Sequence, residues 1–119
     1  MNAGCCLARL VMDRIGERWT MLACQEIAAG SRRFGDLKSA LDGVSNKVLS
    51  ETLVRLERDG LIERRVFDSR PPTVQYELTP MGTSLLEVVR GIVDWSAQHG
   101  PYIEEARRSY ENLELSAVG

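Results

Sequence analysis

Apolar residues recur every three or four positions through most of the chain, which is the spacing of amphipathic helices. In the first half of the chain this pattern predicts four helices. The first ends near Gly16, Gly30 stops the second, the short third ends at Asp42-Gly43, and the fourth starts at the N-cap Ser45 and stops at Asp59-Gly60. Their apolar positions are Leu7, Leu10, Val11 and Ile15, then Trp19, Leu22, Ala23 and Ile27, then Phe34, Leu37 and Leu41, and finally Leu49, Leu53 and Leu56.

Two extended segments follow the fourth helix. Residues 61–67 are rich in β-branched, aromatic and arginine side chains, and residues 74–78 alternate apolar and polar side chains, as a half-buried strand does. The residues between them, 68–72, include two prolines, which cannot join a strand ladder. The pattern therefore predicts a β-hairpin with a turn over 68–72.

The last third of the chain is again helical in pattern. Thr79-Pro80 combines an N-cap with a proline at the first helical position, which predicts a long helix from there to about His99. Gly100-Pro101 is expected to break this helix, because proline lacks the backbone N–H that the helix interior needs. A last polar helix is predicted over about 102–113.

The long helix carries two apolar stripes that lie about 110° apart around its axis. Together they are wider than the face that one core usually requires. We expect one stripe to pack on the chain's own core and the other on a second copy, against its long helix or its first helix. The alternative is a helix wedged between the hairpin and the last helix of its own chain. The core stripe is Met81, Leu85, Val88, Ile92 and Trp95, and the predicted dimer stripe is Leu86, Val89 and Val93.

The order of these elements predicts the fold class. Two short helices joined by a tight glycine-containing turn form a helix-turn-helix, and a hairpin directly behind the second helix makes it a winged helix. The fold is expected to be mainly α with a small β-hairpin, and with N- and C-terminal dimerisation helices. The predicted single domain covers 1–119, with the helix-turn-helix at about 33–59, the wing at about 61–78 and the dimerisation helices at about 5–16 and 80–113.

Composition excludes several classes of protein. At 119 residues the chain has room for one core, and it has no apolar run long enough for a membrane helix. No signal-peptide pattern is present at the N-terminus, so a cytoplasmic location is expected, without a membrane partner. A single histidine, His99, and an odd number of cysteines (three) argue against a metal site, a histidine-based catalytic triad and a disulfide framework. No phosphate-binding loop or carboxylate cluster appears, so neither an enzyme nor a cofactor is expected.

Charge is unevenly distributed along the chain. The net charge is −2, yet residues 31–72 hold nine basic and seven acidic side chains, a net of +2, while residues 73–119 hold three and seven, a net of −4. A local basic surface can bind phosphates on an acidic protein because salt screens charges beyond roughly 10 Å. The charge distribution therefore permits nucleic-acid binding in the middle third.

Several motifs follow one another along the chain: Cys6, Ile15-Gly16-Glu17-Arg18-Trp19-Thr20, Arg33-Phe34-Gly35-Asp36-Leu37, Val44-Ser45-Asn46-Lys47-Val48-Leu49, Leu53, Leu56-Glu57-Arg58-Asp59-Gly60-Leu61-Ile62, Arg64, Pro71-Pro72-Thr73-Val74-Gln75-Tyr76-Glu77-Leu78-Thr79, Gly82, Leu85 and Trp95. In these motifs the sequence resembles the HxlR-type branch of the MarR-like winged-helix transcription regulators. The resemblance implies a homodimer that binds a near-palindromic double-stranded DNA operator, with a redox- or electrophile-sensing cysteine in some members. The chain departs from the family pattern at Leu7, where proline is usual, at Glu17-Arg18, which replaces Gly-Lys, and at Thr73 and Gln75.

The fourth helix is the predicted recognition helix, because its polar face lies opposite the leucine stripe. Asn46, Lys47 and Ser50 are the candidates for contacts with base edges and adjoining phosphates, and Val54 is placed to meet a thymine methyl group. Glu51 lies on the same face, where a carboxylate either accepts a hydrogen bond from a cytosine amine or repels phosphate. A solvated helix face is the alternative for all of these positions.

Arginines beside this helix are candidates for contacts with the DNA backbone. Arg70 at the wing tip is placed to enter the minor groove, and Arg32 and Arg33 precede the third helix. Arg64 and Arg65 should point to opposite faces of their strand. Arg64 either faces DNA or forms a structural ion pair under the hairpin, and the sequence leaves both interpretations open.

Cys6 is the candidate sensor of an oxidant or a small electrophile. It lies near the start of the first helix, where the positive helix end and Arg9, one turn along, favour a thiolate. Cys5 is an alternative reactive thiol, whereas Cys24 is expected to be an inert packed side chain. An unreactive, buried Cys6 is the competing interpretation.

The function predicted from the sequence is a sequence-specific DNA-binding transcription regulator that acts as a homodimer. Two alternatives stay open. One is a winged-helix adaptor that binds a protein, and the other is a regulator without thiol chemistry that senses a small molecule in a dimer-interface pocket near Trp19 and Trp95.

Overall fold

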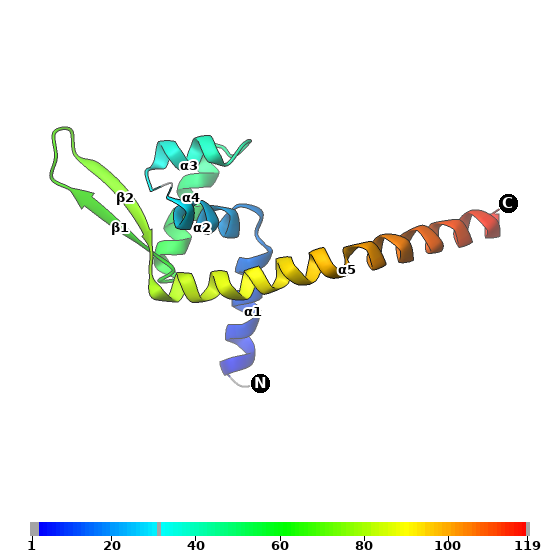
Figure 1. Ribbon diagram of the computed structural model, residues 1–119. Helices are drawn as coiled ribbons and strands as arrows, with labels where there is room; N and C mark the ends of the chain where they lie inside the picture. The colour runs from blue at the N-terminus through cyan, green and yellow to red at the C-terminus, as the bar shows by residue number, and fades with distance from the viewer. Residues whose placement is uncertain (1–2, 31, 119) are drawn as a thin grey trace. The chain divides into compact units, whose positions relative to one another are not determined.

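The computed structural model describes residues 3–30 and 32–118, and it is mainly helical with one antiparallel hairpin (Figure 1). This arrangement confirms the predicted winged helix. The elements are α1 (Ala3–Gly16), α2 (Arg18–Ala29), α3 (Phe34–Ala40), α4 (Asn46–Arg58), β1 (Ile62–Phe67), β2 (Thr73–Leu78) and α5 (Pro80–Val118).

The chain divides into two compact units, Met1–Glu87 and Val88–Gly119. The first contains α1 to α4, the hairpin and the start of α5, and the second consists of the remainder of α5. No described helix combines the length and the apolar character that a bilayer crossing needs.

The core of the first unit forms where α2 packs against α1, α3, α4 and β2. Leu37, Leu49, Leu53, Leu56 and Ile62 are among its fully buried side chains. The leucines of α4 lie on one helix face because they are spaced three and four residues apart, as the sequence pattern predicts. This packing fixes α4 against the other helices and leaves its opposite face outside.

The hairpin pairs Ile62 with Leu78 at its base and Phe67 with Thr73 near its tip. The beginning of α5 is attached to this base. The Thr79 N–H donates to the Leu61 carbonyl (3.1 Å), and the Thr79 hydroxyl donates to the Gly60 carbonyl (2.7 Å) while accepting the N–H of Gly82 (3.1 Å). Thr79 is therefore both the N-cap of α5 and its anchor on the wing.

The predicted break at Gly100-Pro101 is wrong, because α5 continues through Pro101 to Val118. A proline inside a helix removes one backbone hydrogen bond, at a cost of about 3 kcal/mol, but it does not forbid the turns on either side. Strong helix formers follow it, among them Glu104, Glu105 and Ala106, and they continue the helix. His99 consequently lies inside α5, and its ring centroid is 4.8 Å from that of Trp95.

The two apolar stripes of α5 are also assigned the wrong way round by the sequence pattern. Leu86 and Val89, predicted to contact a second copy, are buried within the single chain at 4% and 6% exposure, and only Val93 of that stripe is exposed. Most of the predicted core stripe is exposed instead: Met81, Val88, Ile92 and Trp95 are exposed, and only Leu85 is half-buried. The pattern identifies two apolar faces, but helical spacing alone cannot say which of them meets the core.

Candidate nucleic-acid interface

The outer face of α4 is a row of exposed side chains opposite the buried leucines. Asn46, Lys47, Ser50 and Val54, all predicted contacts, are exposed, and so is Glu51. An open groove runs along this face, lined by Ser50, Glu51, Val54, Arg55 and Arg58. The structure thus brings the predicted α4 residues together on one accessible helix face.

The turn between α3 and α4 holds the start of that face in place. The Ser45 hydroxyl accepts the Val48 N–H (3.1 Å), as expected of an N-cap. Before it, the Lys38 ammonium donates to the Val44 carbonyl (2.6 Å), and the Val44 N–H donates to the Leu41 carbonyl (3.2 Å). The Lys38 ammonium is thus hydrogen-bonded within the turn, whereas the Lys47 side chain is exposed at the first turn of α4.

The wing separates its arginines by face. Arg64 is opposite Tyr76 in the hairpin, and Arg65 is opposite Gln75. Arg65 forms ion pairs with Glu63 (3.6 Å) and Glu77 (3.3 Å), while the described residues give Arg64 no ion pair. Of the two interpretations of Arg64, the DNA-facing one is favoured. Arg65 makes the structural ion pairs of the hairpin, and Arg64 is exposed.

Arg32 is held against the wing by two contacts. Its guanidinium pairs with Glu77 (3.0 Å), and its carbonyl accepts the Tyr76 N–H (2.7 Å). Glu77 therefore partly neutralises both Arg32 and Arg65. The sequence pattern does not predict that Glu77 pairs with these arginines, because Glu77 is simply a polar position of an alternating strand.

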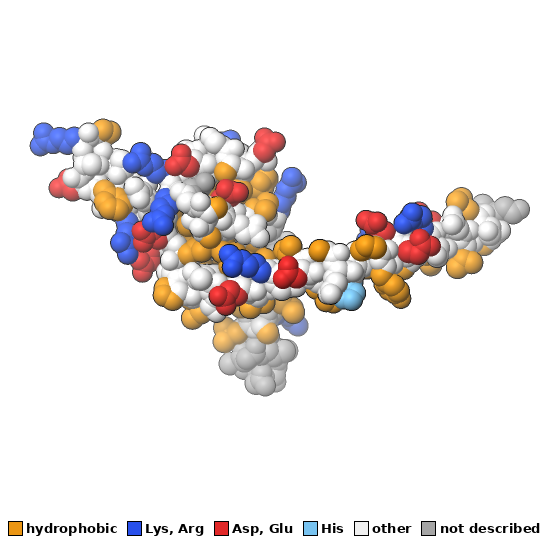
Figure 2. All heavy atoms as spheres, viewed as in Figure 1, with side chains coloured by type: hydrophobic (Ala, Val, Ile, Leu, Met, Phe, Trp, Pro, Cys, Tyr) orange, Lys and Arg blue, Asp and Glu red, His pale blue; other side chains and the backbone are white. Residues whose placement is uncertain are grey.

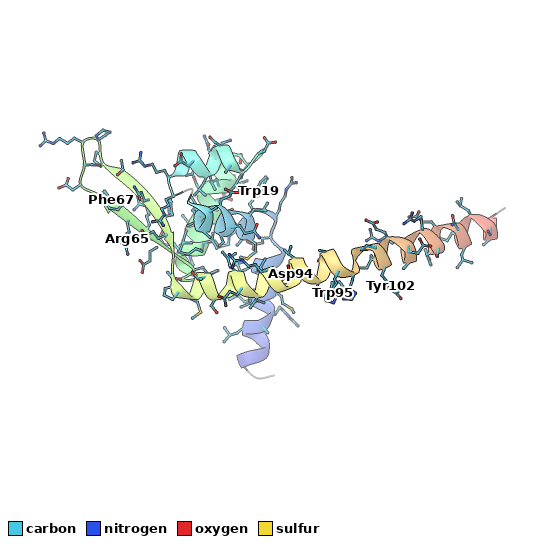
Figure 3. The ribbon with its side chains drawn as sticks, viewed as in Figure 1. Trp19, Arg65, Phe67, Asp94, Trp95 and Tyr102 are labelled. Carbon is cyan, nitrogen blue, oxygen red and sulfur yellow. The ribbon has the colours of Figure 1, made fainter. Side chains whose placement is uncertain are left out.

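Two further predicted arginines are exposed without such pairing in the described part of the chain. Arg33 is the residue directly before α3, and Arg70 lies in the loop at the wing tip. Figure 2 shows basic side chains gathered on the wing side of the first unit. Figure 3 places Arg65 and Phe67 along the same hairpin.

The family described as HxlR-like helix-turn-helix matches residues 14–104. The chain belongs to this family. An HTH-type transcriptional regulator of Escherichia coli, YtfH, which is itself uncharacterised, is 35% identical over 102 residues, covering 86% of this chain and 81% of YtfH.

Solved structures agree with the family membership. A MarR-family transcriptional regulator from Enterococcus faecalis superposes with a TM-score of 0.75 at 31% identity, over 90% of this chain and 94% of that one. The oxidised form of the redox regulator HypR superposes with a TM-score of 0.70 at 28% identity, over 78% and 96% of the two chains. This HxlR-like protein is therefore a transcriptional regulator of the helix-turn-helix type and not an enzyme.

The thiols of the HxlR-like chain differ sharply in their surroundings. Cys6 is exposed on α1, which begins at Ala3. Cys24 is buried in α2, and burial raises the pKa of its thiol to about 11, which agrees with the prediction of an inert packed side chain. The side chain of Cys5 lies outside the described residues. Among the described residues, no three histidine, cysteine, aspartate or glutamate side chains are grouped to hold a metal ion.

One polar cluster in the first unit is not predicted from the sequence. It joins Arg14 and Glu17, at the corner between α1 and α2, to Arg55 and Asp59 at the end of α4. Burial by itself raises the pKa of Glu17, but the Thr20 hydrogen bond and the charges of Arg55 and Arg14 together lower it below its usual value. The signal that could have found the cluster is Glu17 itself, an acid where the family usually has glycine.

Proposed function

We propose that this HxlR-like regulator binds double-stranded DNA in a sequence-specific manner through the outer face of α4. The observation that carries the proposal is the exposed polar row on a helix that is fixed by its opposite, buried face. Asn46, Lys47 and Ser50 lie at the N-terminal end, from which a recognition helix reaches base edges in the major groove. Asparagine pairs with adenine, lysine with guanine, and Val54 offers an apolar contact for a thymine methyl group.

The arginines of the wing and of α3 supply the contacts with the sugar-phosphate backbone in this proposal. Arg70 at the wing tip suits a narrow minor groove, and Arg33 and Arg64 are exposed for phosphates. Arg32 contributes less, because its guanidinium already pairs with Glu77. Such contacts add affinity without sequence information, so the specificity of the complex would come from α4.

The proposed active form is a homodimer. We define the α5 seam as Val88, Ile92, Trp95, Tyr102, Ala106 and Leu113. These residues are three, four or seven positions apart, so they fall on the seam positions of a coiled-coil heptad, and the two positions between them are His99 and Ser109. The seam is exposed in the single chain: its larger side chains range from 47% exposed at Ile92 to 77% at Tyr102, and Ala106 is exposed as well. Figure 3 shows Trp95 and Tyr102 pointing to the same side of α5.

A second copy is the occupant that suits this seam. Identical helices pair through identical apolar rows, and a two-fold dimer presents two recognition helices to a near-palindromic operator. On α1, Leu7, Leu10 and Val11 are exposed and share one helix face, so α1 offers a second apolar surface for the same partner. These assignments replace Leu86 and Val89, which the single chain buries.

The DNA proposal is tested by measuring the affinity of the purified protein for the DNA upstream of its own gene. A shuffled duplex of equal length and composition serves as the reference. We expect the upstream duplex to bind about 10³-fold or more tightly than the shuffled one. The affinity for both should fall steeply between 50 and 200 mM salt, as counterion release requires (about 10³-fold for six phosphate contacts). Equal, salt-insensitive affinities would reject the proposal and favour a protein-binding adaptor.

The finer part of the proposed function is redox sensing through Cys6. Its support is the exposure of Cys6 near the N-terminus of α1, together with the similarity to HypR, which is a redox regulator. In the proposed reaction, an oxidant removes two electrons and two protons from the Cys6 thiol and a second thiol, which join as a disulfide. The second thiol belongs to the other copy or to a small thiol compound, and a dithiol reductant reverses the step.

We expect diamide to change operator affinity in the wild type, and dithiothreitol to restore it, while Cys6→Ser should not respond. Cys24→Ser is the matched control and should respond like the wild type, because its thiol is buried. The readout is fluorescence anisotropy of a labelled operator duplex before and after treatment. The same diamide response in Cys6→Ser as in the wild type would assign the sensing to another residue.

A further inference from the structure

The carboxylate of Glu17 makes three contacts, one each with α1, α4 and α2. Its Oε1 atom accepts from Arg14 Nη1 (2.9 Å), and its Oε2 atom accepts from Arg55 Nη1 (2.8 Å) and from the Thr20 hydroxyl (2.6 Å). Arg14 also donates through Nε to Asp59 Oδ2 (2.7 Å). Every member of this cluster is partly buried, so solvent screens these charges less than it screens surface pairs.

The cluster attaches α4 at two points one helical turn apart. Arg55 lies in the last turn of α4, and Asp59 is the C-cap that follows the helix. Apolar packing of Leu49, Leu53 and Leu56 holds α4 in place but is not directional. Charged hydrogen bonds at both Arg55 and Asp59 depend on direction, so they limit rotation of α4 about its own axis.

We infer that Glu17 is a positioning residue that sets the orientation of α4 on α1, and through it the direction in which the recognition face is presented. This inference rests on the proposed DNA-binding function for its consequence, but its structural part does not depend on DNA. The same α1 helix carries Cys6 eight residues before Arg14, about 12 Å along the axis. A displacement of α1 is therefore passed to α4 by Arg14 and Glu17.

The test compares Glu17→Gln with Glu105→Gln. Glutamine keeps the size of the side chain but removes the charge that binds two arginines. In the described part of the chain, the one ion pair of Glu105 is with Arg108 on the same helix, at 3.6 Å. Glu105→Gln therefore controls for the loss of one acidic charge. Two quantities are measured for each variant: amide hydrogen exchange across α4 without DNA, and affinity for the operator and for a shuffled duplex.

In Glu17→Gln we expect faster exchange in α4, about ten-fold weaker operator binding and a smaller loss on the shuffled duplex. The salt dependence should be unchanged, because Glu17 does not contact phosphate in the proposed complex. Glu105→Gln should match the wild type in all of these measurements. Glu17→Asp, which keeps the charge on a shorter side chain, should fall between the wild type and Glu17→Gln.

A pH series adds a readout with a definite sign. Because the folded-state pKa of Glu17 is lowered, its stabilisation is complete above the ordinary pKa of a glutamate and is lost as the pH falls through the lowered value. The stability difference between the wild type and Glu17→Gln should therefore be largest near neutral pH and should shrink in acid.

Two outcomes would overturn the inference. If amide hydrogen exchange in α4 were the same in Glu17→Gln as in the wild type, Glu17 would not link α1 to α4. Lower thermal stability with unchanged operator affinity of the folded variant would make Glu17 an ordinary stabilising ion pair. If the wild type itself bound no DNA, the proposed function would fail, and the exchange experiment would still decide the link.

Discussion

Ile92→Glu is expected to convert the dimer to a monomer, the largest change in assembly that a single substitution should cause. Ile92 is the second residue of the α5 seam, one turn after Val88, and is 47% exposed in the single chain. Dimerisation can bury only the half of Ile92 that is exposed in the single chain, so its loss removes roughly 1 kcal/mol per chain, and the two chains lose it together. The desolvation of two facing carboxylates adds to this loss, so the dimer dissociation constant should rise by more than about 100-fold.

Light scattering during gel filtration measures this effect, with the wild type at twice the 13.3 kDa mass of one chain and Ile92→Glu at that mass. Ala97→Glu is the matched control. Ala97 is also exposed on α5, but it lies about 140° around the helix axis from Ile92, outside the seam. The Ala97→Glu variant should therefore stay dimeric. Dimeric Ile92→Glu, or a monomeric wild type, would show that the seam is not the dimer interface.

Gly82→Ala should produce the largest loss of stability among conservative substitutions on α5. Gly82 lies in the first turn of α5, where a β-carbon would overlap the backbone carbonyl of Leu61 and crowd the Leu78 side chain. Backbone cannot move aside as a flexible side chain does. Relief would require α5 to shift from the base of the wing, with a typical cost of about 1–3 kcal/mol for overpacking.

Gly91→Ala is the control for this prediction, because a β-carbon there meets nothing within 4 Å. Alanine in a helix interior is favoured over glycine by about 0.5–1 kcal/mol, so this variant should be slightly more stable than the wild type. Urea unfolding followed by circular dichroism gives both values. A Gly82→Ala protein as stable as the wild type would contradict the close approach of α5 to Leu61.

The sequence predicts the winged helix well because its determinants are local. Ser45 caps α4 as expected, and Gly30 ends α2 with a φ of 116°, a conformation that glycine adopts without strain. The exposed row of α4 follows from the helical period once Leu49 and Leu53 are buried. Elements whose signals lie within a few residues of each other can be predicted in this way.

The sequence does not predict features that depend on distant partners. Burial of Leu86 and exposure of Trp95 are decided by the tertiary packing of α5, and both residues are equally apolar in the pattern. Pro101 reads as a break because the local rule omits the helix formers around it. The contacts of Glu17 with Arg55 and of Glu77 with Arg32 join residues 38 and 45 positions apart, and spacing gives no hint of them.

The central claim is that the outer face of α4 and the tip of the wing bind DNA. Its most direct test is operator affinity of the double variant Lys47→Ala/Arg70→Ala, whose fold is first verified by circular dichroism. Loss of the lysine base contact alone should cost about 1–3 kcal/mol of specific binding. Loss of Arg70 should weaken binding to all sequences and reduce the salt slope by about 1.

Arg107→Ala, which removes an exposed basic side chain from the distal part of α5, is the control and should bind like the wild type. The measurement is a fluorescence anisotropy titration of the operator duplex at several salt concentrations. We expect at least about ten-fold weaker binding by the double variant, with a shallower salt dependence than that of the wild type. A folded double variant that binds its operator with wild-type affinity and salt dependence would contradict this placement of the DNA-binding surface.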